Sequence, residues 1–191
     1  MQQTEHEPAL LNNLQELGLK NYEKQKILSR LARYIAFDKG EAIVKAGDFP
    51  KDFFVILSGL ARYYYLSPQG KEWNKAFFRE GQLIGSLSSF LRRQPCTYTI
   101  SAIEPCTLAA IPLSIFNNEQ DSQLQTLLNR YVREIMLRNE EREALLLTCN
   151  NEERYRWLLQ HQVWLVSRVP QYQLASYLGM EPVSLSRIKN K

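Results

Sequence analysis

The 191-residue chain contains no run of eighteen apolar residues, so its sequence predicts no membrane-spanning helix. Its first residues, Met1 to Glu7, lack the basic-then-apolar pattern of a secretion signal. Cysteine is scarce: Cys96, Cys106 and Cys149 are an odd number without CxxC spacing. This pattern argues against a disulfide framework and favours a reducing cytoplasm.

Histidine is also scarce, and neither His6 nor His161 lies at metal-ligand spacing from a cysteine. The chain also lacks a Ser/His/Asp constellation and a phosphate-binding loop. We therefore predict no metal site, no cofactor and no enzymatic activity. The net charge of +4 allows nucleic-acid binding without requiring it.

Residues 171–190 carry the most informative pattern, that of a helix-turn-helix, although an ordinary helical hairpin in a core is the alternative. Gly179 can take the positive φ of a tight turn between two helices. Pro182 stands in a first-turn position, where its missing N–H costs nothing. The apolar positions that would join the two helices are Leu174, Ala175, Leu178, Met180, Leu185 and Ile188.

The remaining face of the second helix is polar and basic, and its size suits a major groove. Residues 151–191 hold six basic residues against three acidic ones, a surplus that phosphate contact would need. We expect Arg187 to contact a base. The full set of predicted DNA-contacting residues is Gln171, Tyr172, Val183, Ser184, Ser186, Arg187, Lys189, Asn190 and Lys191.

The rest of the chain divides by its periodicity. Residues 8–30 are helical in pattern, with a break at Gly18. Residues 32–112 alternate short β-prone runs with turn signals, which indicates a small β-barrel or sandwich. Within this region, residues 83–90 lie between strands and are the expected ligand-facing insertion. The predicted strands are Tyr34–Phe37, Glu41–Val44, Phe53–Leu57, Leu60–Leu66, Lys71–Phe78, Tyr98–Ile103 and Thr107–Ile111.

Residues 121–148 contain no glycine or proline and predict one helix of roughly 40 Å. Its apolar residues step by four, three and four positions: Leu124, Leu128, Tyr131 and Ile135. Such a seam predicts a symmetric two-helix coiled coil between two copies of the chain. The alternative is that the seam packs on the chain's own β-domain.

This order of barrel, long helix and helix-turn-helix resembles the CRP/FNR family of bacterial transcription regulators. The resemblance covers nearly the whole chain and is most specific over Val169–Lys191 and Gly81–Ile111. It implies an α+β fold with a cyclic-nucleotide-binding-like jelly-roll barrel. The implied units are a sensor domain with helical lead-in (1–120), a dimerisation helix (121–148) and a helix-turn-helix domain (149–191).

The family's nucleotide motif, Phe-Gly-Glu-Leu followed by Pro-Arg-Ser/Ala, is altered here to Ile-Gly-Ser-Leu (84–87) and Pro-Cys-Thr (95–97). The resemblance implies that Ser86 and Cys96 replace the ribose-binding Glu and the phosphate-binding Arg. We therefore expect a degenerate pocket lined by Gly85, Ser86, Leu87, Cys96 and Thr97. Arg92 and Arg93 are either a substitute anion site or a solvated pair.

The sequence thus predicts a cytoplasmic homodimeric transcription regulator that reads a pseudo-palindromic operator. Its effector is something other than cyclic AMP, or none. The predicted partners are duplex DNA, a second copy of the chain, RNA polymerase, and an effector of unknown identity if there is one. The alternative is a sensor or interaction module whose helix-turn-helix does not bind DNA.

Overall fold

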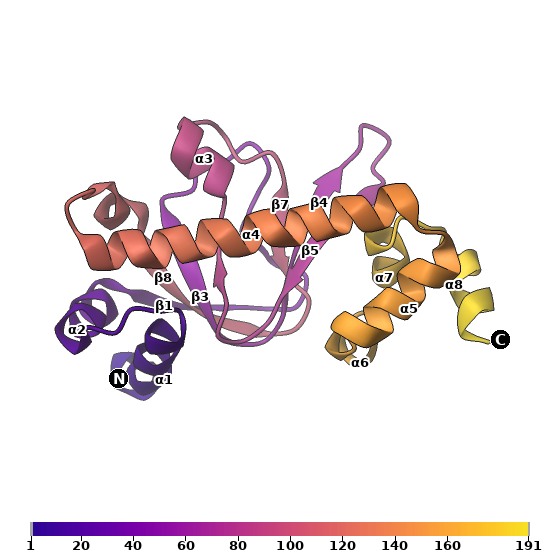
Figure 1. Cartoon of the computed structure of the whole chain (residues 1–191). Coiled ribbons are helices and arrows are strands. Elements are labelled where there is room, and N and C mark those ends of the chain that lie inside the picture. The colour runs from indigo at the N-terminus through magenta and orange to yellow at the C-terminus, as the bar shows by residue number, and fades with distance from the viewer. Residues whose placement is uncertain (1, 191) are drawn as a thin grey trace.

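The structure, a computed structural model, describes residues 2–190, with side chains described from residue 5 onward. Two helices, α1 (Gln2–Glu16) and α2 (Tyr22–Leu31), lead into a β-barrel. The long helix α4 (Ser122–Thr148) runs along the barrel and ends beside a group of short C-terminal helices (Figure 1). Along the described residues, no helix combines the length and the hydropathy that a bilayer span requires.

The barrel is a jelly roll of two four-stranded antiparallel sheets, so the predicted α+β fold is confirmed. The strand orders are β1-β8-β3-β6 and β2-β7-β4-β5. Sequence reasoning missed β6, because a strand of two residues leaves no periodic signal. The strands are β1 (Arg33–Phe37), β2 (Ala42–Val44), β3 (Asp52–Ser58), β4 (Ala61–Leu66), β5 (Glu72–Phe78), β6 (Leu83–Ile84), β7 (Thr99–Ala102) and β8 (Cys106–Pro112).

Strand β3 is buried on both faces, which explains its continuous apolar run. Phe54 and Ile56 point into the barrel interior. Phe53 and Val55 point outward, into a second core that they share with α1, α2 and α4. The barrel is therefore packed inside and also carries an outer helical layer.

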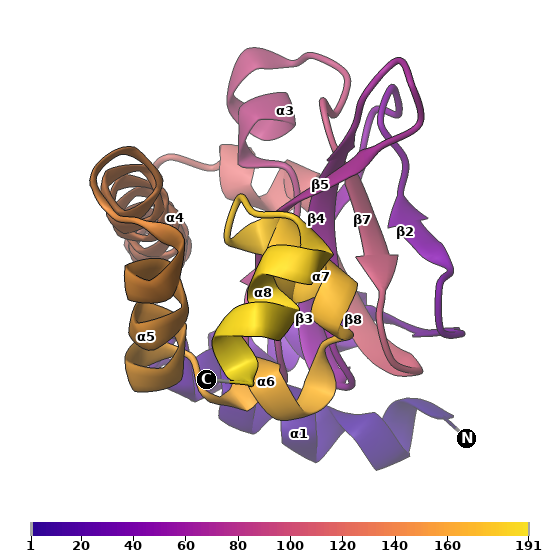
Figure 2. The ribbon, with the colours of Figure 1, turned by 90° about the vertical axis from the view of Figure 1, so that its right-hand side faces the viewer.

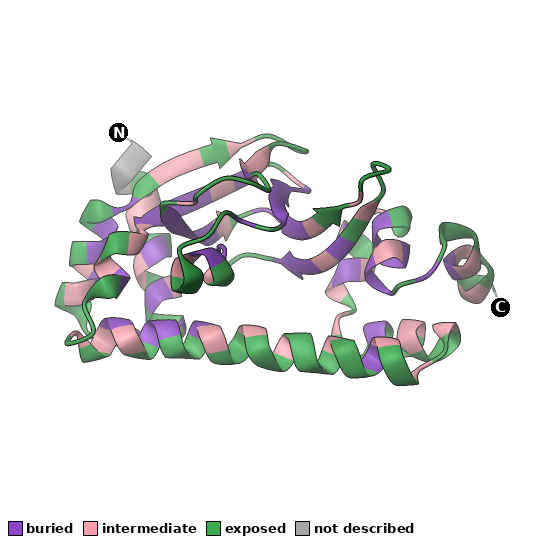
Figure 3. Cartoon of the chain, turned by 90° about the horizontal axis from the view of Figure 1, so that it is seen from above, coloured by how far each residue is buried: buried purple, intermediate pink, exposed green. Residues whose placement is uncertain are grey.

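Helix α4 begins at an Asp121 cap, whose carboxylate accepts the Leu124 N–H and pairs with Lys24. The six-residue helix α3 (Leu87–Arg92) lies between β6 and β7, and the 3₁₀ turn η1 (Leu113–Asn117) precedes α4. Viewed from above, the outward side of α4 is largely exposed while its barrel side is partly buried (Figure 3).

Four helices form the C-terminal unit: α5 (Asn151–His161), α6 (Trp164–Arg168), α7 (Gln171–Tyr177) and α8 (Pro182–Lys189). Helix α5 starts with a capping box between Asn150 and Glu153. The unit's apolar core continues onto one end of the barrel, where it includes Leu60, Phe77 and Ile103. An end-on view shows α7 and α8 in front of the barrel, with α4 and α5 to one side (Figure 2).

Candidate functional site

The first candidate site is the loop between β6 and α3, which the family motif occupies. Gly85 has φ +154°, and a Cβ there would lie 2.3 Å from Cδ1 of Phe53, so only glycine fits. Ser86 is buried and caps α3 by accepting the Ser89 N–H. Its hydroxyl also lies 2.7 Å from that of Ser89. The Ser86 hydroxyl therefore already has its hydrogen-bond partners at the start of α3.

Three buried tyrosines converge on this loop from different elements. Tyr63 comes from β4, Tyr98 immediately precedes β7, and Tyr131 comes from α4. Each hydroxyl donates to the carbonyl oxygen of Gly85 at 3.1 Å. The Tyr63 oxygen also accepts the Gly85 N–H at 2.6 Å. Sequence reasoning missed this tyrosine cluster, because its members are scattered along the chain.

Burial keeps these hydroxyls neutral. Desolvation raises the pKa of Tyr131 to about 12 and raises the pKa of Tyr63 and Tyr98 well above the usual value. The Tyr63 and Tyr98 rings stack with centroids 4.9 Å apart. The cluster thus offers neutral hydroxyls and ring faces, and no positive charge for a phosphate.

The second half of the motif also lacks a charge for an anion. Cys96 is buried, and its thiol donates to the carbonyl oxygen of Tyr98 at 3.0 Å. Thr97 is exposed, and Leu87 packs partly buried against the outer core. The structure thus brings Gly85, Ser86 and Cys96 near the tyrosine cluster but leaves Thr97 at the surface.

Arg92 and Arg93 lie exposed at the C-terminal end of α3, and Arg93 has a left-handed backbone. Neither makes a hydrogen bond or ion pair within the described residues. Arg93 lines a pocket of about 410 Å³ between α3, η1 and the start of α4, which also contains Glu119. The two arginines therefore do not join the tyrosine cluster.

The predicted dimer seam requires correction. Leu124, Leu128 and Tyr131 are each at most 7% exposed and belong to the outer core against the chain's own barrel. Ile135 is partly buried against the same core. This seam is occupied within one chain, as in the alternative considered above. The error arose because an apolar repeat shows that a face is buried without showing which partner buries it.

The second candidate site is the helix-turn-helix, and its internal packing follows the predicted pattern. Gly179 has φ +67°, and the Met180 N–H donates to the Ala175 carbonyl at 3.0 Å to close the turn. The apolar positions Leu174, Ala175, Leu178, Met180 and Leu185 are all buried, and Ile188 packs against them. The motif is thus a packed pair of helices.

The outer face of α8 is open. Val183, Arg187, Lys189 and Asn190 are exposed, and Ser184 and Ser186 are half-buried. Arg187 and Lys189 make no ion pair or hydrogen bond with any described residue. Lys191 lies outside the described residues.

At the start of α7, Gln171 and Tyr172 are exposed. Tyr172 also lines a groove of about 300 Å³ between α7, α8 and the β4–β5 hairpin. In that groove Lys71 pairs with Glu181 at 2.9 Å. Tyr172 is therefore placed toward the barrel hairpin as well as toward solvent.

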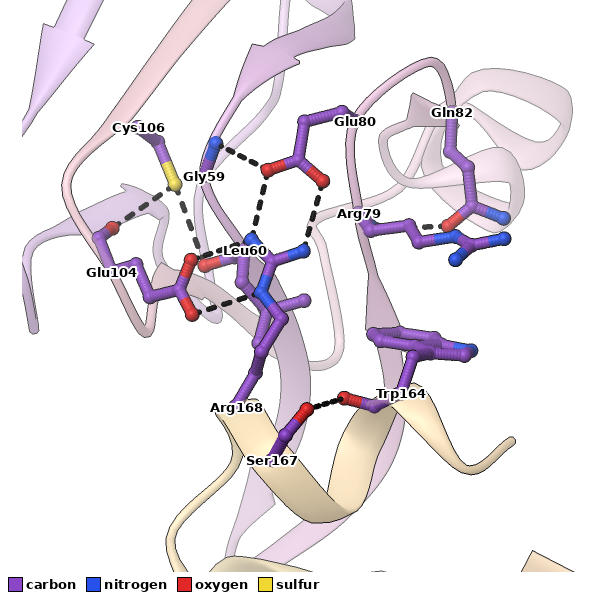
Figure 4. A network of polar contacts seen from close by, with 10 residues as sticks. All are labelled: Gly59, Leu60, Arg79, Glu80, Gln82, Glu104, Cys106, Trp164, Ser167 and Arg168. Carbon is purple, nitrogen blue, oxygen red and sulfur yellow. Dashed lines mark hydrogen bonds and ion pairs between the residues drawn. The ribbon is translucent and has the colours of Figure 1, made fainter. Parts of the chain in front are cut away.

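Two arginines that were counted in the basic surplus instead hold the C-terminal unit together. Arg154 donates to the carbonyls of Leu146, Cys149 and Leu178, and so joins α4, α5 and the turn. Arg168 donates to both oxygens of Glu80 and of Glu104 on the barrel (Figure 4). The basic surplus free for phosphate is therefore smaller than the sequence count suggested.

A third arginine, Arg142 of α4, joins three elements. Its guanidinium donates to the Asn74 carbonyl on β5 and to the Tyr177 carbonyl on α7, both at 3.1 Å. Asn74 adds its own bonds to α7: its N–H donates to the Ser176 hydroxyl and its side-chain amide to the Gln173 carbonyl. Sequence reasoning missed this joint, because its acceptors are mostly backbone carbonyls.

The fold thus links a β-barrel through one long helix to a helix-turn-helix. Residues 34–122 match the cyclic nucleotide-binding domain family. The nitrogen fixation regulation protein FixK of Bradyrhizobium diazoefficiens is 25% identical over 96% of this chain and 78% of its own length.

Solved structures show the same fold. FixK2 from Bradyrhizobium japonicum superposes with a TM-score of 0.72 at 20% identity, covering 83% of each chain. A transcriptional regulator of the CRP/FNR family from Eubacterium rectale gives 0.70 at 18% identity, covering 89% of this chain and 82% of that one. These likenesses show that the chain has the fold of these regulators.

Proposed function

We propose that the protein is a homodimer that binds pseudo-palindromic duplex DNA through α8. The observation that carries this proposal is the open face of α8, where Arg187 and Lys189 have no partner in the described chain while the opposite face is buried. A long, planar donor without a partner at the surface suits bidentate contact with guanine. Dimeric helix-turn-helix proteins place two such helices about one DNA turn apart.

The remaining polar groups divide by position. Ser184, Ser186, Lys189 and Asn190, with Lys191 beyond the described residues, would share base-edge and phosphate contacts. Val183 is 61% exposed at the first turn of α8 and would touch a thymine methyl. Gln171 and Tyr172 would contact a phosphate near the start of α7.

The dimer contact falls on the outward face of α4. That face carries large exposed apolar side chains, with Met136 at 62%, Leu137 at 45% and Leu147 at 77%. A 27-residue helix with apolar groups on its free side suits pairing with a second copy of itself. Replacing Met136 and Leu137 together with Asp should give monomers in sedimentation, because two charges would face two charges across the axis.

We propose that cyclic AMP and cyclic GMP are not effectors of this protein. Ser86 and Cys96 carry no charge for them, and the three tyrosines occupy the space beside Gly85. Calorimetry at millimolar nucleotide should detect no binding. A micromolar dissociation constant would contradict this part of the proposal.

The DNA-binding proposal is tested by enriching genomic fragments on the purified protein and then titrating the enriched site and a scrambled duplex at two salt concentrations. Arg187→Ala should lower affinity for the enriched site by about 1–3 kcal/mol and reduce the ratio of specific to non-specific binding. Lys189→Ala is the matched control: it should weaken both duplexes alike and flatten the salt slope.

Two other results would change the assignment of α8. Equal loss on both duplexes for Arg187→Ala would reassign it to phosphate contact. No salt-dependent duplex binding by the wild-type protein would overturn the proposal and favour a helix-turn-helix that contacts protein.

A further inference from the structure

Strand β5 contains a bulge that redirects one lysine. Tyr63 pairs with Ala76 and Tyr64 with Asn74, so Lys75 is the extra residue in the ladder. A bulge turns its side chain out of the regular alternation, and bulges are frequent beside functional sites. Here the Lys75 side chain lines a pocket of about 420 Å³ between the β4–β5 hairpin and α4.

The Lys75 ammonium has no carboxylate partner and no hydrogen bond within the described residues. Its nearest described partners are two aromatic faces: the ring centroids of Tyr98 and Tyr65 lie 5.8 and 5.9 Å from Nζ. Burial, and then the charge of Arg142, lower the pKa of Lys75. The two rings offset only part of the cost of burying this cation, and no carboxylate offsets the rest.

Arg142 lines the same pocket from α4 and is also not neutralised. Among the described residues its only hydrogen bonds are to two backbone carbonyls, and its Nε is buried with no partner among them. Burial lowers the pKa of this guanidinium too. Glu143 lines the pocket but forms no ion pair with either cation. The positive charges of Lys75 and Arg142 thus share one pocket, and the Nε–H of Arg142 has no acceptor among the described residues.

We propose that this pocket binds a small phosphorylated molecule, whose phosphate contacts Lys75 and Arg142 and whose organic part lies against Tyr65 and Leu146. A phosphate monoester carries a charge of about −1.5 to −2, which matches two cations better than one carboxylate does. The combination of a guanidinium fork and a point-charge ammonium suits phosphate oxygens. The pocket volume lies within the range of small-molecule sites.

The position of the pocket gives the ligand a route to the helix-turn-helix. Arg142 bonds at once to β5 and to α7, so a phosphate that draws its guanidinium changes the joint between barrel and helix-turn-helix. This regulatory consequence rests on the proposed function, whereas binding itself does not. Binding is therefore measured on the full chain without DNA.

The experiment follows the thermal midpoint of unfolding in phosphate-free buffer with adenosine 5′-monophosphate, glucose 6-phosphate and inorganic phosphate. Adenosine and glucose are the matched unphosphorylated controls. At least one of the two phosphate esters should raise the midpoint by several degrees at saturating concentration, and more than inorganic phosphate does, while adenosine and glucose should not. No shift with either ester at 10 mM would overturn the proposal. A shift with adenosine equal to that with its monophosphate would also overturn it.

Variants locate the site. Lys75→Met should abolish the shift and raise the midpoint of the ligand-free protein, because it removes an uncompensated charge. Lys75→Glu should abolish the shift and raise the ligand-free midpoint further, because it supplies Arg142 with a carboxylate. Lys45→Met, at an exposed lysine elsewhere on the barrel, should leave both properties unchanged. A full phosphate-dependent shift in Lys75→Met would place the ligand elsewhere and contradict the proposal.

Discussion

The N-terminal half of α4 and the C-terminal unit both pack on the barrel, but they do so by different chemistry. The first inserts Leu124, Leu127 and Leu128 into a continuous apolar core. The second makes a smaller apolar contact that is surrounded by arginine-held joints at Arg142 and Arg168. The first contact is mainly apolar, whereas the second depends on charges that a ligand or a proton can reach.

The largest expected effect is at the apolar contact. Leu128→Asp places a charge in the outer core and should destabilise the protein by about 3–5 kcal/mol, measured by denaturant unfolding. Asn129→Asp, at the adjacent exposed position of the same helix and outside the proposed dimer contact, should cost a small fraction of that. If the two variants unfold alike, the assignment of inner and outer faces is wrong.

The next effect concerns Arg168. Arg168→Met removes four hydrogen bonds and leaves Glu80 beside Glu104, with an expected loss of about 1–2 kcal/mol, moderated by partial exposure of the network. Adding Glu80→Gln and Glu104→Gln to that variant should recover part of the loss, because the repulsion disappears. Denaturant unfolding of the wild type, Arg168→Met and the triple variant gives the comparison. A triple variant no more stable than Arg168→Met would show that charge repulsion contributes nothing here.

The joint at Arg168 should respond to pH differently from the joint at Arg142. Hydrogen bonds from Arg168 lower the pKa of Glu80 below its ordinary value of 4.5. Because the folded pKa is the lower one, the stabilisation is fully present above the unfolded value and is lost as pH falls through the folded value.

The measurement is the amide chemical shift of Gly59, whose N–H donates to Glu80 at 2.9 Å. It should titrate with a midpoint below 4.5. The Asn74 amide, which donates to Ser176 at the other joint, is the internal control and should not follow the same curve. If the Gly59 and Asn74 amides titrate with the same curve, the whole C-terminal unit separates from the barrel as the pH falls.

The smallest expected effect is at the tyrosine cluster. Tyr131→Phe keeps the ring in the outer core and removes only the hydroxyl that donates to Gly85, so it should cost about 1 kcal/mol in denaturant unfolding. Val132→Ala, on the next, half-buried position of α4, is a control for changes in the helix itself. A loss above 3 kcal/mol would show that the hydroxyl organises the loop as well as bonding to it.

Patterns between residues close in the sequence predicted most of the helices and strands. The turn glycine at 179 and the spaced aliphatics of α7 and α8 predicted a helix pair that the structure contains, and alternating apolar runs predicted seven of the eight strands of the described barrel. Contacts between distant segments could not be read this way. The Gly85 carbonyl collects three tyrosines from positions 63, 98 and 131, and no spacing rule connects them.

The same limit explains why the basic surplus of the C-terminal region was overestimated and why the apolar seam of α4 was assigned to a dimer contact. Arg154 and Arg168 read as free cations, because their carbonyl and carboxylate acceptors lie elsewhere in the chain. The bulge at Lys75 depends on its pairing with β4, which the sequence of β5 alone does not contain.

Helix α4 is continuous from the outer core to the helix-turn-helix, and this gives it the mechanics of a lever. The barrel holds the helix at Tyr131 and at the leucines before it. The C-terminal unit is attached at the far end, beyond Leu146. For the arm of roughly 25 Å from Tyr131 to the end of α4, a tilt of about 5° moves the far end by roughly 2 Å and Arg142 by roughly 1.5 Å. A shift of that size stretches a hydrogen bond of 3.1 Å beyond bonding distance, so a rotation too small to disturb the core is enough to break the joint at Tyr177.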